Sequence, residues 1–296
     1  MRSGGPPRQG QGPQGRGRCR QRHGRRRGPL AHGVARRGSL LLEAGVEPIL
    51  QLTCRDRNRI ALQSDLLAAA ALGIENLLLL RGDDPSAGDQ PDAKPVFDID
   101  TMALTEVARR IRDRQELMSG QKVSGKAKFL IGAADAPIDP PAGWKPTRLK
   151  AKIDAGTQFA QTQFCMDANV VRRYAQCLAD NGLKGFVLLI GLAPIRSARS
   201  ARWIRDKLPG SIVPDAVIER LEKSPEPVRE GRKICLELVE ELSDVPERPA
   251  CTSWRRATMP AWPKSWRKPP ASPSARRANR PTSAAAKKLW LLRLQT

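Results

Sequence analysis

Histidine is missing from the central part of this sequence. Both histidines of the 296 residues, His23 and His32, precede Glu43, and none follows it. A catalytic triad built on histidine, a histidine general base and a histidine-ligated metal are therefore excluded after Glu43. We expect no metal ion in this part of the chain.

Two other chemical signals are also missing. The sequence has six cysteines but no CxxC pair, and no secretory signal is recognisable. We therefore expect free thiols in a reducing compartment, the cytoplasm, rather than a zinc site or a disulfide framework. No GxGxxG motif opens a helix after an apolar run, which argues against a dinucleotide-binding Rossmann domain.

Long apolar runs are scarce as well. The best candidate for a membrane span, residues 66–80, is interrupted by Gly73, Glu75 and Asn76. It is also shorter than the roughly 20 apolar residues that a spanning helix needs. We therefore expect no membrane association.

Acidic residues are missing from the first 42 residues, which hold 11 Arg, and residues 247–296 hold 12 Lys+Arg and one acid, Glu247. Subtracting both ends from the 52 basic and 30 acidic residues leaves 29 of each in residues 43–246. The net charge of +22 therefore resides in the two ends, and the central block is neutral.

Three interpretations of the ends, residues 1–42 and 247–296, remain open. They are disordered basic tails, an Arg/Gly-rich binder of nucleic acid, or a GC-rich coding region read out of frame, which yields Arg, Gly, Pro, Ala and Trp. Neither end shows the period of a strand or a helix, and the patterned sequence starts and stops abruptly. This favours the third interpretation. A transit peptide is disfavoured because serine is scarce and no amphipathic stripe is present.

In residues 43–246, short apolar runs alternate with longer amphipathic ones. This β-α-β-α rhythm predicts a parallel sheet covered by helices. The predicted strands are Pro48–Thr53, Asn76–Leu80, Lys128–Ala133, Phe159–Phe164 and Phe186–Ile190. The predicted helices are Arg59–Leu72, Thr101–Met118, Thr147–Ala155, Asn169–Asn181, Ser197–Leu208, Asp215–Glu222 and Pro227–Leu242.

The same rhythm suits a doubly wound sheet and a (β/α)8 barrel of the TIM type. Polar residues gather directly after the predicted strands, at 53–56, 81–84, Asp135 and Gln163. A barrel builds its site at the carboxyl ends of several strands, so we favour the barrel. Five strands are recognisable where a complete barrel has eight, and we expect an incomplete barrel with disordered basic ends.

Four segments resemble successive strand ends of the flavin-dependent methylenetetrahydrofolate reductase family. They are LQLTCRDRNR (50–59), LLLLRGDDP (77–85), KAKIDAG with QFAQTQF and MD (150–167), and GLAPIRS (191–197). They occur in the family's order and spacing. The resemblance implies a (β/α)8 barrel that holds FAD and reduces 5,10-methylenetetrahydrofolate to 5-methyltetrahydrofolate with a nicotinamide donor, in one-carbon metabolism and methionine biosynthesis.

The resemblance also implies the residues of the site. The predicted FAD-binding residues are Gln51, Thr53, Leu80, Arg81, Gly82, Asp83, Ala133, Ala134, Arg148 and Lys152. Asp83 is predicted to be catalytic, because a carboxylate there can tune the flavin and stabilise a cationic form of the substrate. Gln163 is predicted to bind the pterin.

Other roles for these residues remain open. Residues 81–83 can form a simple turn closed by a surface ion pair, Lys152 can belong to a solvated basic helix face, and Gln163 can be a satisfied core amide. Where many relatives carry Asp and Asn, this chain has Lys145 and Arg148.

One residue of the family's site is missing from this sequence. The family's general acid is a glutamate at the end of its first strand, and no acid precedes Glu43 here. The Arg/Gly segment stands where the first two strands are expected, and the basic segment after Val245 stands where the eighth is expected. The sequence therefore supports a reductase, a non-catalytic relative or, less well, a basic-tailed nucleic-acid binder. Members of the family often assemble, so a homo-oligomer is a further expectation.

Overall fold

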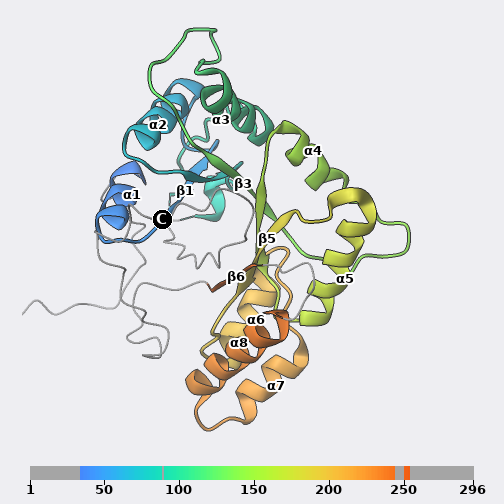
Figure 1. Ribbon diagram of the computed structural model, residues 1–296. Coiled ribbons are helices and arrows are strands. Elements are labelled where there is room, and N and C mark those ends of the chain that lie inside the picture. Colours follow the sequence, from blue (N-terminus) through green and yellow to red (C-terminus); the bar gives the residue numbers. More distant parts are fainter. Residues whose placement is uncertain (1–33, 89, 244–249, 254–296) are drawn as a thin grey trace, which may run out of the picture.

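A computed structural model describes residues 34–88, 90–243 and 250–253. All its strands belong to one parallel sheet with the order β1-β2-β3-β4-β5-β6 (Figure 1). The strands are β1 (Ile49–Thr53), β2 (Asn76–Leu80), β3 (Leu130–Asp135), β4 (Phe159–Phe164), β5 (Val187–Leu192) and β6 (Ala250–Ser253).

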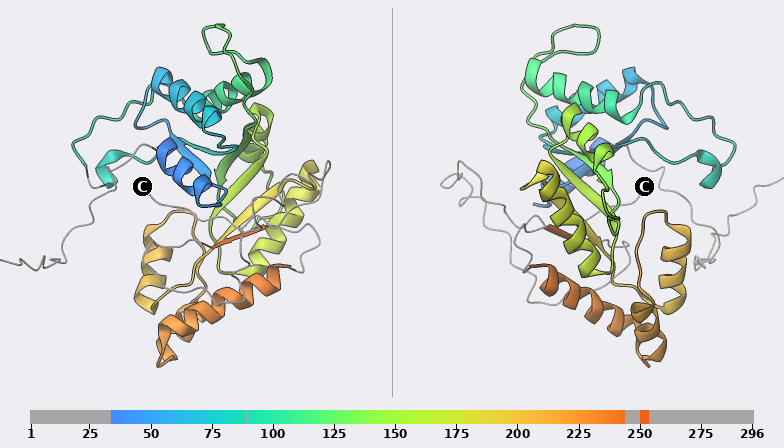
Figure 2. Two further views of the ribbon diagram at one scale, coloured as in Figure 1. Left: turned by 60° about the vertical axis from the view of Figure 1, so that its left-hand side comes forward. Right: turned by 90° about the vertical axis from the view of Figure 1, so that its right-hand side faces the viewer.

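The strand order decides between the two α/β architectures. A doubly wound sheet reverses its order at a switch point, whereas here each strand pairs with the next one along the chain. This is the winding of a (β/α) barrel, and the predicted α/β fold is confirmed. In the described part of the chain β1 and β6 are the edges, so these strands form a curved open sheet rather than a closed ring (Figure 2).

Helices cover the outer side of the curved sheet (Figure 1). They are α1 (Val34–Glu43), α2 (Arg59–Ala71), α3 (Thr101–Arg114), α4 (Thr147–Ala155), α5 (Ala168–Leu178), α6 (Ala198–Lys207), α7 (Asp215–Lys223) and α8 (Pro227–Ser243). Single turns, η1 (Pro85–Ala87) and η2 (Ala179–Leu183), follow β2 and α5. The side chains of Asn58, Asp100, Asp167 and Ser197 accept hydrogen bonds from the first free N–H groups of α2, α3, α5 and α6, which explains where these helices begin.

Alternation along the strands separates two faces of the sheet. Leu50, Leu52, Leu77 and Leu79 are buried in one cluster with residues of α2 and α3, and Leu188, Ile190 and Leu192 are buried in another with α5 to α8. The intervening residues of each strand point to the opposite, inner face.

Two elements lie in segments where the sequence predicted none. Helix α1 begins at Val34, before the predicted boundary at residue 43, and packs on β1 and α2. Strand β6 lies at Ala250–Ser253 beside β5, near the place expected for the eighth strand. The other interpretations of the two ends fall on residues 1–33, 244–249 and 254–296, outside the described residues.

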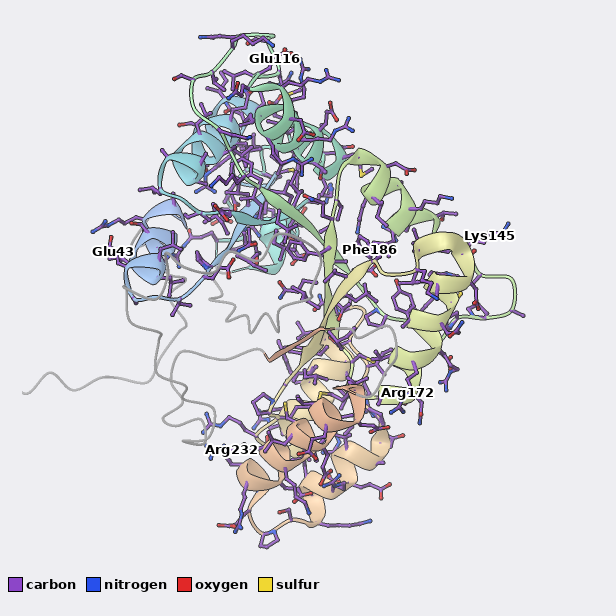
Figure 3. The ribbon with its side chains drawn as sticks, in the orientation of Figure 1. Glu43, Glu116, Lys145, Arg172, Phe186 and Arg232 are labelled. Carbon is purple, nitrogen blue, oxygen red and sulfur yellow. The ribbon has the colours of Figure 1, made fainter. Side chains whose placement is uncertain are left out.

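Helix α3 ends four residues earlier than predicted. Gln115 adopts a left-handed conformation with φ 51°, which stops the helix at Arg114. Glu116, labelled in Figure 3, then pairs with Lys122 across a tight turn. Its carboxylate accepts hydrogen bonds from Lys122 (2.9 Å) and Arg110. Met118 therefore belongs to a turn and not to the helix.

None of the helices in the described ranges has the length and apolar character that a membrane span requires. The same ranges contain no group of three or more His, Cys, Asp or Glu side chains arranged to hold a metal ion.

Candidate active site

Most of the predicted site residues lie near the carboxyl ends of β1 to β4. Gln51 and Thr53 alternate with the buried Leu50 and Leu52, so they point to the inner face. Thr53 is the register partner of Leu80 on β2. Parallel strands end at one edge of the sheet, which places these side chains beside one another at a common mouth.

Ala133 and Ala134 do not share a face. Ala134 is exposed and points, like Gly132 two residues earlier, to the inner face. Ala133 is 1% exposed and points, like the buried Ile131, to the helix-covered side. Only the Ala134 side chain can line the inner face. Gly132 keeps this part of the face open for the ring of Phe159, because a Cβ on Gly132 would lie 2.2 Å from that ring.

The loop after β2 lies directly on the end of β1. Gly82 has φ +87°, and a Cβ placed there would lie 2.7 Å from Cβ of Arg55 and 3.3 Å from Cβ of Thr53. Both the backbone conformation and the close approach therefore require glycine. Asp83 is exposed, and its backbone oxygen accepts a hydrogen bond from Nη1 of Arg55 at 3.3 Å.

Arg81 is held by an aromatic ring that sequence reasoning missed. Its guanidinium carbon lies 4.2 Å from the centre of the Phe97 ring, within the range of a cation–π contact. Phe97 has φ 42°, which is unusual for an aromatic residue, and its N–H donates to the Cys54 oxygen at 3.2 Å. The signal in the sequence is an apolar pair, Val96 and Phe97, inside an otherwise polar loop.

Lys152 lies beside β3 on helix α4. Its ammonium group donates to the Ala134 oxygen at 2.6 Å. Burial lowers the pKa of Lys152, the Asp135 carboxylate acts in the opposite direction, and Arg148 adds to the lowering. Arg148 is exposed one turn earlier on the same helix. The two cations therefore stand together next to the end of β3.

A half-buried carboxylate, Asp135, lies at the carboxyl end of β3. Its Oδ2 accepts a hydrogen bond from the hydroxyl of Tyr174 at 2.6 Å. Burial raises the pKa of Asp135, although Tyr174 and the charge of Lys152 act against this rise. The sequence showed Asp135 after a strand but gave it no role, and its partner stands 39 residues later on α5.

Asp135→Asn is expected to reduce the loss of stability with rising pH. A carboxyl whose pKa is raised by folding binds more protons in the folded state than in the unfolded state. Its contribution to the free energy of unfolding is therefore complete below the ordinary pKa of 3.8 and is lost as the pH rises through the pKa of the folded state. Urea unfolding from pH 3.5 upward measures this. Asp139→Asn is the control, because Arg173 lowers the pKa of Asp139 and the change should have the opposite sign. Identical pH profiles for wild type and Asp135→Asn would contradict the assignment.

Gln163 is presented at an irregularity in β4. The register to β5 shifts between Gln161 and Phe164, which leaves one extra residue in β4. The hydroxyl of Thr162 accepts a hydrogen bond from the N–H of Gly191 at 3.0 Å and donates to the backbone oxygen of Gln163 at 2.8 Å. This arrangement leaves the half-buried Gln163 side chain at the mouth.

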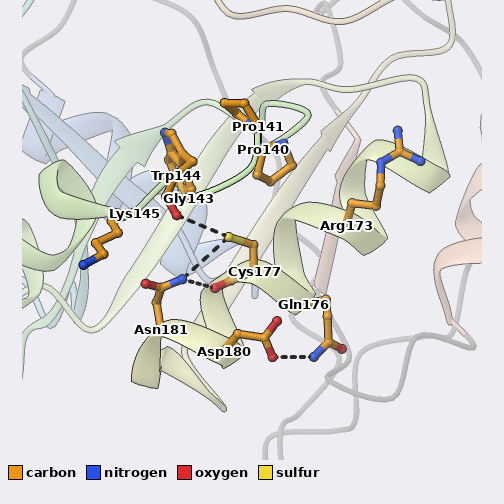
Figure 4. A pocket seen from close by; sticks show the side chains of 10 residues that line it. All are labelled: Pro140, Pro141, Gly143, Trp144, Lys145, Arg173, Gln176, Cys177, Asp180 and Asn181. Carbon is orange, nitrogen blue, oxygen red and sulfur yellow. Dashed lines mark hydrogen bonds between the residues drawn. The ribbon is translucent and has the colours of Figure 1, made fainter.

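A hollow of about 440 Å³ lies elsewhere, between the loop that follows β3 and helix α5 (Figure 4). The ring of Trp144 packs against Tyr174, and the Cys177 thiol donates to the Trp144 oxygen at 3.9 Å. None of the predicted site residues lines this hollow. The candidate site therefore rests on the strand ends.

Comparison with known families gives one match that covers most of the chain. The family model described as methylenetetrahydrofolate reductase matches residues 31–245. The match begins inside the segment 1–42 and includes all the predicted site residues.

Two curated proteins show the same likeness. The probable methylenetetrahydrofolate reductase (NADPH) of Caenorhabditis elegans is 27% identical over 214 residues, which are 70% of this chain and 30% of that protein. Methylenetetrahydrofolate reductase 2 of Schizosaccharomyces pombe is 28% identical over 183 residues, which are 58% of this chain and 27% of that protein. The chain thus spans less than a third of the length of these relatives.

Two solved structures show a more distant overall likeness. A 2,3-dimethylmalate lyase of the PEP mutase/isocitrate lyase superfamily has a TM-score of 0.37 and 13% identity, over 68% of this chain and 56% of that one. An uncharacterized protein from Clostridium thermocellum that binds two copies of 5-methyl-5,6,7,8-tetrahydrofolic acid has a TM-score of 0.32 and 16% identity, over 74% and 91%.

Proposed function

Because this chain belongs to the methylenetetrahydrofolate reductase family, we propose that it reduces 5,10-methylenetetrahydrofolate to 5-methyltetrahydrofolate through FAD, with a nicotinamide donor. The observation that carries the proposal is that most of the predicted residues lie at one mouth. Residues from β1, β2, β3, β4 and α4 meet there although they are spread over residues 51–163.

The residues of the mouth fit FAD. Lys152 and Arg148 supply positive charge for a diphosphate beside the end of β3. The small side chain of the exposed Ala134 leaves the neighbouring inner face open to a flat ring. When bound, FAD would accept a hydride from the nicotinamide and pass it to the methylene carbon of the folate.

Each polar residue of the mouth has a proposed task. Gly82 lets the loop backbone approach the flavin, and the Arg81 guanidinium, held over Phe97, donates to it. The Asp83 carboxylate stabilises positive charge that develops on the folate. The Gln163 amide offers one donor and one acceptor to the pterin ring.

Binding of the ligands without turnover is a second candidate function. It is favoured by one observation: residues 1–42, where the resemblance places the family's first-strand glutamate, contain no acidic residue. Loss of a general acid removes about 10²- to 10⁴-fold in rate. For both candidate functions we propose a location in the cytoplasm and a role in one-carbon metabolism and methionine biosynthesis. We further propose that the protein assembles as a homo-oligomer.

An anaerobic assay separates the two candidates. The full chain, reconstituted with FAD, is supplied with NADH or NADPH and methylenetetrahydrofolate, and 5-methyltetrahydrofolate is measured by mass spectrometry. Product formation that needs both FAD and the nicotinamide is the result expected of the reductase. Bound FAD and folate without product would establish the second candidate, and no binding of either would contradict both.

Lys152→Met is expected to weaken FAD binding about 10- to 100-fold, because it removes a charge-assisted hydrogen bond to the diphosphate. FAD fluorescence quenching measures the dissociation constant. Lys150→Met is the matched control, since Lys150 is exposed on the same helix. Equal weakening in both variants would assign the effect to general charge and contradict a specific role for Lys152.

A further inference from the structure

Arg55, just beyond β1, is joined through its backbone to two parts of the connection between β2 and α3. Its N–H donates to the Arg81 oxygen at 3.0 Å, and its own oxygen accepts from the Val96 N–H at 2.8 Å. The two bonds tie both ends of this long connection to one residue. Arg55 has no role in the site predicted from the family resemblance.

The Arg55 side chain makes a second set of contacts to the same loop. Its Nε and Nη2 donate to the two carboxylate oxygens of Asp56, at 2.6 and 3.2 Å, and Nη1 donates to the Asp83 oxygen at 3.3 Å. The Thr53 hydroxyl also donates to Asp56, at 2.7 Å. The aliphatic part of Arg55 lies where a Cβ on Gly82 would come within 2.7 Å of it. Arg55 therefore fills the space that glycine leaves.

In this arrangement Arg55 contacts the backbone oxygen of Asp83 and not its carboxylate. The backbone oxygen is held by Arg55, whereas the carboxylate has no hydrogen-bond partner within the described residues. A guanidinium would pair more strongly with a carboxylate than with a peptide oxygen. Asp56 prevents that exchange, because both of its oxygens already engage Arg55. Burial would raise the pKa of Asp56, but the hydrogen bonds from Arg55 and Thr53 lower it, so Asp56 keeps its charge at neutral pH.

We propose that Arg55 is a positioning residue, which fixes the loop of Asp83 through its backbone oxygen while Asp56 keeps the arginine away from the Asp83 carboxylate. This inference rests on the proposed function for the role of Asp83. The pair acts on the reaction only through Asp83, which it holds at the mouth with a free negative charge.

The chain contains a matched control for this pair at the opposite end of the sheet. Arg112 donates to both oxygens of Asp113, at 2.6 and 3.0 Å, and its Nη1 donates to the Phe129 oxygen at 3.3 Å. The geometry resembles that of Arg55, with one further bond from Nη1 of Arg112 to the side-chain oxygen of Gln158 at 2.5 Å. Phe129 precedes β3 and stands far from the strand ends that form the mouth. A general loss of ion pairing or stability would affect both sites alike.

We call the contacts by which Arg55 fixes the loop of Asp83 the Arg55 clamp. Hydrogen exchange of the full chain, followed by mass spectrometry, tests this clamp without any ligand. The reporters are the N–H groups of Arg55 and Val96, which form the two backbone bonds. In R55M both are expected to exchange about tenfold faster, because a charge-assisted contact is lost, and in R112M they are expected to match the wild type. R55K keeps the charge but lacks the planar guanidinium with its several donors, so its exchange rates should lie between those of the wild type and R55M.

The reduction potential of bound FAD tests the role of Asp56. In D56N the Arg55 guanidinium is released to pair with the Asp83 carboxylate, so the potential should become less negative while the reporter amides stay protected. Unchanged exchange in R55M, or in R55K where R55M fails to fold by circular dichroism, would overturn the clamp. An unchanged potential in D56N would overturn the role of Asp56. A wild type that binds no FAD while R55M still loosens the loop would refute the proposed function but keep the clamp.

Discussion

Asp83→Asn is expected to lower the rate of methylenetetrahydrofolate reduction about 10²-fold, with little change in FAD affinity. The reason is electrostatic, because the amide cannot stabilise the positive charge that develops on the folate in the transition state. The loop itself should keep its shape, since Arg55 holds it through the Asp83 backbone oxygen and not through the carboxylate. Steady-state formation of 5-methyltetrahydrofolate and an FAD titration measure the two quantities.

The neighbouring acid offers a matched control for this substitution. Asp84 is also exposed, and its carboxylate caps the turn η1 by accepting from the Ser86 N–H at 2.9 Å. Asparagine can make the same capping bond, so Asp84→Asn should leave the rate within about threefold of the wild type. Equal losses in the two variants would show that net charge in the loop matters, rather than the carboxylate of Asp83.

Gly82→Ala is expected to have the largest effect on FAD binding. A left-handed conformation costs a residue with a Cβ about 1–2 kcal/mol, and the new methyl group would overlap Arg55, which adds about 1–3 kcal/mol. The loop must move away from β1 to relieve the overlap, so FAD affinity should fall at least about tenfold. Urea unfolding measures the loss of stability, and fluorescence quenching measures the affinity.

Gly73→Ala separates strain from overlap. Gly73 has φ +75°, close to that of Gly82, but no atom lies within 4 Å of a Cβ placed there. Its substitution should cost only the strain, about 1–2 kcal/mol, and should leave FAD affinity unchanged. A Gly82→Ala protein that binds FAD as the wild type does would show that this loop does not approach the flavin.

The strands were predictable because buried parallel strands read as continuous apolar runs. The predicted bounds of β2 and β4 agree with the structure, and β3 begins two residues later than predicted. A shift of two residues preserves which side chains face inward. The alternation along β1, β2 and β4 points Gln51, Thr53, Leu80 and Gln163 to the inner face, and their contacts with FAD and folate stay predictions.

The features that were missed depend on contacts between distant residues. Helix α1 lies in an Arg- and Gly-rich segment without useful periodicity, and its Gly38 is buried against Ile74, 36 positions further along. Asp135 meets Tyr174 across the space between β3 and α5. No local pattern in the sequence brings such partners together, so they could not be read from it.

The choice between Ala133 and Ala134 shows a second limit of the sequence. Two neighbouring small residues at a strand end look equivalent, but alternation sends only one of them to the inner face. The parity becomes clear once Ile131 is known to be buried under the helices. The predicted contact at Ala133 therefore falls on the wrong side of the sheet, and Ala134 remains.

Titration of the purified full chain with FAD tests the account most directly. The shift of the flavin absorbance bands and the quenching of FAD fluorescence report binding, and each is repeated with Lys152→Met, Lys150→Met and Gly82→Ala. We predict saturable binding of about one FAD per chain, weakened by Lys152→Met and Gly82→Ala but not by Lys150→Met. A folded chain that leaves the FAD spectrum unchanged, or binds FAD equally well in all four forms, would contradict it.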